Sequence, residues 1–332
     1  MKPIVVFALP LLLLQPILSA ISAIAQQSPS PDLTFHTSSN LVLVDVFAID
    51  PKNGLPDQTL KRDDFELFDN DHPVALTTFD TGKQTRPLAL WFVVQCSMEG
   101  WEREGSRFFQ GQINRLMPTL KHLPPQDQVA VAHWCDNGDS QLDLRPTSNI
   151  DDAAASLERV LTLKRDASPS DRPGELALQR TLQLIVDTTR SSAREPLPVV
   201  IFLYGDHSGM PREEADHFIN ELLETSAIAF GLKDRRSPNM WFLLGEQKEV
   251  AHYIATQTGG EYLAVAPDKY ATGLEEILRQ LHFRYELGFK PETLDGKRHK
   301  LTVKLAAAAK NQHKGVRLRF RAAYVPVGDG NK

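Results

Sequence analysis

The chain has 332 residues, of which 42% are hydrophobic and 24% are charged, so its composition is that of a globular protein with one large or two modest domains. Its formal net charge is −5, and this mildly acidic balance gives no reason to expect nucleic acid or an anionic membrane surface as a partner. Two cysteines, Cys96 and Cys135, are too few for a disulfide scaffold.

Residues 1–25 have the pattern of a secretory signal. A basic start precedes the apolar run "IVVFALPLLLL", and Ala23 and Ala25 supply the small residues of a cleavage site. An uncleaved anchor is the alternative, but the run is short and prolines interrupt it. We therefore expect an exported protein, periplasmic or secreted, with no membrane span after cleavage. Residues 26–36 are Pro/Ser-rich and predict a linker.

Residues 37–80 predict the N-terminal part of a small β module. "NLVLVDVFAID" alternates between apolar and polar residues as a half-buried strand does, and an Asn-Gly turn signal follows it. "DDFELFD" and "PVALTTFD" predict two more short strands. A unit of three short strands is marginally stable alone, so we expect it to pack against another part of the chain.

Residues 86–283 alternate between buried strands and helices. The apolar runs "PLALWFVV", "QVAVAHW", "PVVIFLY", "AIAFGL" and "EYLAVA" predict strands that are buried on both faces. Helices are expected around 109–120, over "DDAAASLERVLTL" and "ELALQRTLQLIVDTT", after Pro211, near 246–257, and along the stripe Leu274, Ile277, Leu278 and Leu281. This alternation predicts an α/β fold with a Rossmann-like, mainly parallel sheet and helices on both faces.

Residues 284–326 return to β structure. "RYELGFK", "HKLTVKLA" and "GVRLRFRAAYV" predict three strands that are joined by polar turns without an intervening helix. Because this segment and residues 37–80 are each too small to bury a core, we expect them to form one discontinuous, sandwich-like β module. The α/β domain is then inserted in that module, and the tail 327–332 is expected to fray.

The order of these elements resembles a von Willebrand factor A domain, and most closely the VWFA-related family of secreted acidobacterial proteins. The resemblance covers nearly the whole mature chain and is carried by "LVLVDVFAID", "LKRDDFELFDNDHPVALTTFD", "RPLALWFVV", "DQVAVAHWCD", "PVVIFLYGD" and "YELGFKPETLDGKRHKLTVKL". It implies that the first two central strands are parallel neighbours. It also implies a role in adhesion or assembly rather than catalysis.

Members of that family with a complete metal site hold Mg²⁺ or Mn²⁺ at the carboxyl ends of the central strands. Their ligands are an Asp-x-Ser-x-Ser loop, a Thr and an Asp, whose hard oxygens suit these ions. The amide of Gln95 lacks the charge of the first Asp, so we interpret the site as degenerate and expect no cofactor. A metal-dependent adhesin that takes Mg or Mn through altered ligands is the alternative. The corresponding positions in this chain are Gln95, Ser97, Glu99, Glu175 (or Leu176) and Asp206, the last displaced by one residue.

The degenerate loop is then expected to be a contact surface for a protein partner that the sequence does not identify. Trp101 and Trp134 lie at or beyond strand ends and would anchor a partner if exposed, with core packing as the alternative. The resemblance makes the strands before Cys96 and Cys135 neighbours. A disulfide between these cysteines is therefore one possibility in an exported protein, and two buried free thiols are the other.

Enzymatic chemistry has weaker support in the sequence. Ser97 near Asp206 and His207 would suggest a hydrolase, but no Gly-x-Ser-x-Gly elbow is present. His133 and Cys135 would be two ligands for a soft metal, but no second pair has zinc spacing, which favours an ordinary half-buried strand end. The chain also lacks a Gly-rich phosphate loop after any predicted strand. We therefore predict a non-enzymatic interaction protein.

Overall fold

The fold is taken from a computed structural model. It describes residues 41–81, 86–95, 97–98, 116–135, 138–161, 164–165, 173–190, 196–204, 210–234, 250–266 and 269–326. The predicted signal, linker and tail lie outside the described residues. Within the described segments, no helix has the length and hydrophobicity that a membrane span requires.

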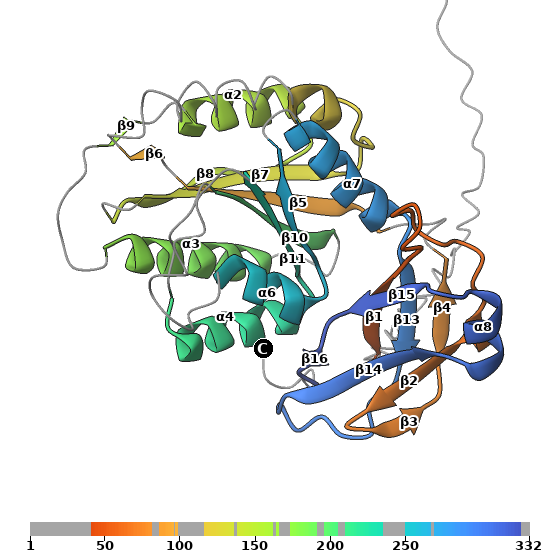
Figure 1. The fold of residues 1–332 in the computed structure, drawn as a ribbon. Helices are drawn as coiled ribbons and strands as arrows, with labels where there is room; N and C mark the ends of the chain where they lie inside the picture. The colour runs from red at the N-terminus through yellow and green to blue at the C-terminus, as the bar shows by residue number, and fades with distance from the viewer. Residues whose placement is uncertain are drawn as a thin grey trace, which may run out of the picture. The chain divides into compact units, whose positions relative to one another are not determined.

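A six-stranded, mainly parallel sheet forms the centre of the α/β part (Figure 1). Its strands are β5 (Leu88–Gln95), β7 (Gln128–Trp134), β8 (Ser140–Thr147), β10 (Leu197–Tyr204), β11 (Ile228–Asp234) and β12 (Tyr262–Val265). They are arranged as β12-β11-β10-β5-β7-β8, and only the β7–β8 pair is antiparallel. Numbered along the chain, this order is 3-2-1-4-5-6, that of a doubly wound α/β sheet. The predicted mainly parallel sheet is confirmed, and β5 and β7 are parallel neighbours.

Helices cover both faces of this sheet (Figure 1). Alternate residues of β5 enter opposite cores, because side chains along a strand point to alternate faces. Leu90 and Phe92 share one hydrophobic cluster with α2 and α7, whereas Trp91 and Val93 share another with α3, α4 and α6. The helices are α2 (Ile150–Leu161), α3 (Pro173–Arg190), α4 (Arg212–Glu224), α6 (Val250–Thr258) and α7 (Tyr270–His282).

Strands from the beginning and the end of the described chain pair in two further four-stranded sheets. One has the order β15-β1-β13-β4 and the other β16-β14-β2-β3. β1 pairs with β13 and β15, and β14 pairs with β2, all antiparallel. One hydrophobic cluster includes Val44 and Val46 of β1 as well as Leu301 and Val303 of β14, so the two sheets share a core. The strands are β1 (Val42–Ile49), β2 (Phe65–Asp69), β3 (His72–Val74), β4 (Thr78–Asp80), β13 (Tyr285–Phe289), β14 (His299–Leu305), β15 (Arg317–Phe320) and β16 (Ala323–Tyr324).

Several local features differ from the sequence prediction. "PVALTTFD" is divided between β3 and β4, and "GVRLRFRAAYV" between β15 and β16, because each segment crosses from one sheet to the other. A short helix, α8 (Ala307–Gln312), follows β14 where only a turn was expected. The helix begins with a run of alanines, and alanine has the highest helix propensity of any residue type. A 3₁₀ turn, η1 (Arg62–Asp64), precedes β2.

A buried cluster of charges joins the terminal sheets to the α/β part. Asp45 of β1 forms ion pairs with Arg86, which precedes β5, and with Arg284, which lies between α7 and β13. Arg321, after β15, donates a hydrogen bond to the carbonyl of Leu43 at 2.7 Å. Burial raises the pKa of Asp45, but the arginines lower it by more, so the net pKa lies below its ordinary value. This carboxylate is therefore held ionised between the two parts of the fold.

Candidate functional site at the carboxyl edge of the central sheet

Gln95 ends the first central strand. It lies opposite Trp134 of β7 in the register, and its side chain is 6% exposed. The seven residues before it are all buried and apolar, so β5 runs without interruption to the carboxyl edge of the sheet, where ligands of doubly wound folds bind. The position that the resemblance assigns to a carboxylate ligand is thus a buried, neutral amide.

The structure describes only part of the predicted metal-ligand set. The backbone of Ser97 lies in β6 (Ser97–Met98), which pairs with β9 (Lys164–Arg165), and that of Glu175 lies in the first turn of α3. The side chains of Ser97 and Glu175, and the whole of Glu99 and Asp206, lie outside the described residues. The degeneracy of the five-position site therefore stays a prediction.

A buried lysine that the sequence patterns did not predict lies at the same edge. Lys233 of β11 pairs with Tyr204 of β10, and its side chain is 4% exposed. The register of β10 with β5 places Lys233 at the level of Gln95, two strands away, which corresponds to about 10 Å. The sequence feature that points to this residue is its position directly after the apolar run 227–232.

Trp134 is a core residue, so its interpretation as a possible partner contact is wrong. Its side chain is 2% exposed and packs in the cluster that includes Ala177 and Leu178 of α3. The alternation along β7 directs it toward the helices that cover that face of the sheet. Trp101, the other possible contact, lies outside the described residues.

His133 precedes Trp134 and is also fully buried, at 2% exposure. Its Nδ1 lies 2.6 Å from Oδ2 of Asp143 on β8, and its Nε2 lies 3.7 Å from Oδ2 of Asp139. Asp143 is itself 2% exposed, and Arg159 of α2 lies 3.5 Å from its other carboxylate oxygen. The imidazole is therefore fixed between two carboxylates, and the predicted half-buried strand end is corrected to a buried polar cluster.

Cys135 belongs to the same cluster. It is 1% exposed and disulfide-bonded. The chain has one other cysteine, Cys96, which lies outside the described residues, so the predicted pairing of the two stays a prediction. The potential ligand atoms of His133, Cys135 and Asp139 all lie within 4.8 Å of one another. This grouping of imidazole, sulfur and carboxylate is a second chemical feature of the carboxyl edge.

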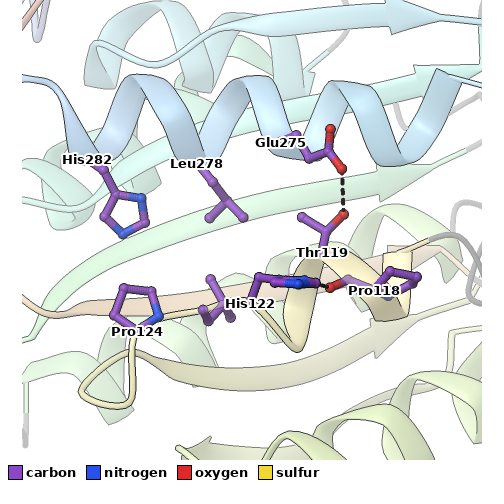
Figure 2. Close-up of a pocket in the computed structure, with 8 residues that line it drawn as sticks. Pro118, Thr119, His122, Pro124, Glu275, Leu278 and His282 are labelled. Atoms are coloured by element: carbon purple, nitrogen blue, oxygen red, sulfur yellow. Dashed lines mark hydrogen bonds between the residues drawn. The ribbon is translucent and has the colours of Figure 1, made fainter.

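A cavity of about 270 Å³ lies at the opposite edge of the sheet, between α7 and residues 118–124 (Figure 2). Thr119 donates a hydrogen bond to Glu275 of α7 at 3.3 Å, and His282 lies 3.2 Å from Asp127. Asp127 also accepts a hydrogen bond from the backbone N–H of Leu88, the first residue of β5. These contacts fasten α7 near the amino edge of the sheet, so we assign a structural role to the polar groups that make them.

No protein-family model and no curated protein matches this chain. Among solved structures, the chain is similar to the conserved hypothetical protein BatB from Bacteroides thetaiotaomicron, with 16% identity, a TM-score of 0.37, and coverage of 58% of this chain and 98% of that one. An aerotolerance-related membrane protein from Bacteroides fragilis has 14% identity, a TM-score of 0.40 and the same coverage. The human COPII-coat protein Sec24c has 10% identity, a TM-score of 0.36, and coverage of 73% of this chain and 44% of that one. These similarities are too weak to assign a function.

Proposed function

We propose that the chain is an exported, non-enzymatic interaction protein with a von Willebrand A-like domain. Its partner is a protein that binds the carboxyl edge of the central sheet without a bridging divalent cation. The observation that supports this most strongly is the buried amide of Gln95 at the end of β5. Mg²⁺ sites in proteins use one or two carboxylates, and this position supplies none.

The alternative function is a metal-dependent adhesin, in which Glu99 and Glu175 restore carboxylates to the ligand set and Mg²⁺ or Mn²⁺ is the ion. A hydrolase that uses Ser97 is a more distant alternative.

The domain arrangement is part of the proposal. Residues 37–80 and 284–326 form one sandwich-like β module, and residues 86–283 are the domain inserted in it, as in the secreted acidobacterial family that the sequence resembles. The shared core of the two terminal sheets supports this arrangement. The module then presents the inserted domain, whose loops contact the partner.

Site-specific photo-cross-linking tests the proposed surface. Gln141 of β8 is exposed and lies opposite His133 in the register, so a benzoylphenylalanine there samples the carboxyl edge. Gln126 is also exposed but precedes β7, so the same substitution there samples the amino edge. In the cells that make the protein, we expect a discrete adduct from Gln141 that persists in EDTA, and none from Gln126.

Other cross-linking results have different meanings. Equal labelling from both positions, or labelling from Gln126 alone, would show that the carboxyl edge is not the contact surface. An adduct from Gln141 that disappears in EDTA would instead support the metal-dependent adhesin.

A further inference from the structure

We propose that reduction of the disulfide at Cys135 creates a binding site for one soft divalent cation such as Zn²⁺, with His133, Cys135 and Asp139 as its protein ligands. This site goes beyond the proposed function. It uses different side chains from the five-position site and selects a different class of ion. The thiolate and imidazole prefer Zn²⁺, whereas Mg²⁺ prefers oxygen ligands alone.

The buried histidine is already oriented as a metal ligand. Asp143 accepts a hydrogen bond from Nδ1 of His133 at 2.6 Å, which leaves Nε2 as the nitrogen that carries the lone pair in a neutral ring. A carboxylate behind the imidazole is the usual support of a zinc-bound histidine. Arg159 in turn lies 3.5 Å from Asp143 and holds that carboxylate in place.

The other side of the imidazole faces the proposed ion. Nε2 is buried and has no hydrogen-bond partner among the residues that the structure describes. It lies 3.7 Å from a carboxylate oxygen of Asp139. A lone pair on this nitrogen and one on the carboxylate oxygen repel each other, so a proton or a cation between the two atoms makes the contact favourable.

The spacing of the three groups is close to that of a zinc site. Tetrahedral Zn²⁺ with nitrogen and oxygen ligands at about 2.1 Å separates those two atoms by about 3.4 Å. The distance here is 3.7 Å, and all three potential ligand atoms lie within 4.8 Å of one another. Small side-chain movements therefore suffice to close the site. The side chain of Asp139 is 33% exposed, which gives the ion a route from solvent.

The disulfide controls the third ligand. A disulfide sulfur has no thiolate charge, so the oxidised chain offers only an imidazole and a carboxylate. A dithiol reductant gives two electrons and two protons to the bond: the S–S bond breaks, two thiols form, and the reductant becomes a disulfide. Cation binding then displaces the proton from the thiol of Cys135. A disulfide oxidant reverses the step: it takes two electrons and two protons and becomes two thiols, the bond at Cys135 forms again, and the loss of the thiolate ligand releases the ion.

A matched pair of variants tests this site with Co²⁺ as the probe. Cys96→Ser and Cys135→Ser both remove any bond between the two cysteines, but only Cys96→Ser leaves Cys135 as a thiol. We expect Cys96→Ser to bind one Co²⁺ per chain without reductant and to show a thiolate-to-cobalt charge-transfer band. Cys135→Ser and the oxidised natural sequence should show no such band, and the natural sequence should acquire it after reduction with a phosphine.

Second substitutions in the Cys96→Ser chain identify the remaining ligands. His133→Gln should abolish the band, and Asp143→Asn should weaken Co²⁺ affinity by about 10–100-fold because it removes the support of the histidine. Asp151→Asn, at an exposed position of α2, is the matched control and should change nothing. Circular dichroism confirms that each variant is folded.

A folded Cys96→Ser protein without the band would overturn the proposal, as would an equal band in Cys135→Ser. If Cys96→Ser does not fold, the reduced natural sequence and its His133→Gln variant decide the question. A band that survives His133→Gln in that background would also overturn it.

Discussion

Replacement of Trp134 with alanine is expected to lower the free energy of unfolding by about 3–5 kcal/mol, because truncation of a buried aromatic side chain removes its contacts and leaves a cavity. Trp134 is 2% exposed and packs between β7 and α3. Urea denaturation monitored by far-ultraviolet circular dichroism measures this change as a lower midpoint with an unchanged slope.

The matched control is an exposed aromatic residue. Phe283 follows α7 and is 40% exposed, so Phe283→Ala should change stability by less than about 1 kcal/mol. The loss of stability caused by Trp134→Phe should lie between the losses caused by Trp134→Ala and Phe283→Ala, because phenylalanine retains an aromatic ring in the core. If Trp134→Ala changes stability no more than Phe283→Ala does, Trp134 is not a core residue and its role as a partner contact is restored.

Asp45→Asn is expected to destabilise the fold by about 3–5 kcal/mol, because it removes the carboxylate that pairs with the buried guanidinium of Arg284. Arg284 and Arg86 both form ion pairs with this carboxylate, and the side chains of Asp45 and Arg284 are 6% and 3% exposed. Asparagine has nearly the same shape as aspartate, so the loss of stability results from the lost charge and not from altered packing. Thermal and urea unfolding both measure this loss.

An exposed ion pair supplies the control for this substitution. Asp71 lies 2.9 Å from Lys300, and both side chains are more than half exposed, so Asp71→Asn should cost less than about 1 kcal/mol. If Asp45→Asn and Asp71→Asn lower the stability equally, burial of the Asp45 cluster does not explain its contribution to the stability of the fold.

The pH dependence of Asp45→Asn follows from the lowered pKa of Asp45. A carboxyl group whose folded-state pKa lies below its ordinary value of 3.8 stabilises the fold fully above about pH 4. That contribution is lost as the pH falls through the folded-state pKa. The stability difference between the natural sequence and Asp45→Asn should therefore be constant from pH 7 to about pH 5 and shrink below about pH 4. A difference that grows as the pH falls would contradict this assignment.

The central sheet could be predicted because β5, β7 and β10 are buried on both faces and are therefore continuously apolar in the sequence. β8 was not predicted because it lies at the edge of the sheet, where most of its residues are only partly buried and Pro146 is tolerated. The divisions at β3–β4 and β15–β16 could not be predicted, since they depend on which sheet the chain joins. That choice is made by tertiary packing and leaves no periodic signal.

The candidate site was predictable only in part. The resemblance located Gln95, but the direction of Trp134 depended on the strand register, which the sequence does not fix. The pairing of His133 with Asp143 was invisible because it requires β8 to lie beside β7. The burial of Lys233 could have been predicted, since this lysine directly continues an apolar strand that is buried on both faces.

The proposal that the carboxyl edge binds no hard cation is tested most directly by thermal unfolding of the oxidised protein in millimolar Mg²⁺ or Mn²⁺. A bound ion at about 100 times its dissociation constant would stabilise the fold by roughly 2.7 kcal/mol, or raise the melting temperature by about 5 °C or more. We predict no change when either ion is added or when EDTA removes it. An EDTA-reversible rise that disappears in Ser97→Ala or Asp206→Ala would contradict this account and identify a metal-dependent adhesin.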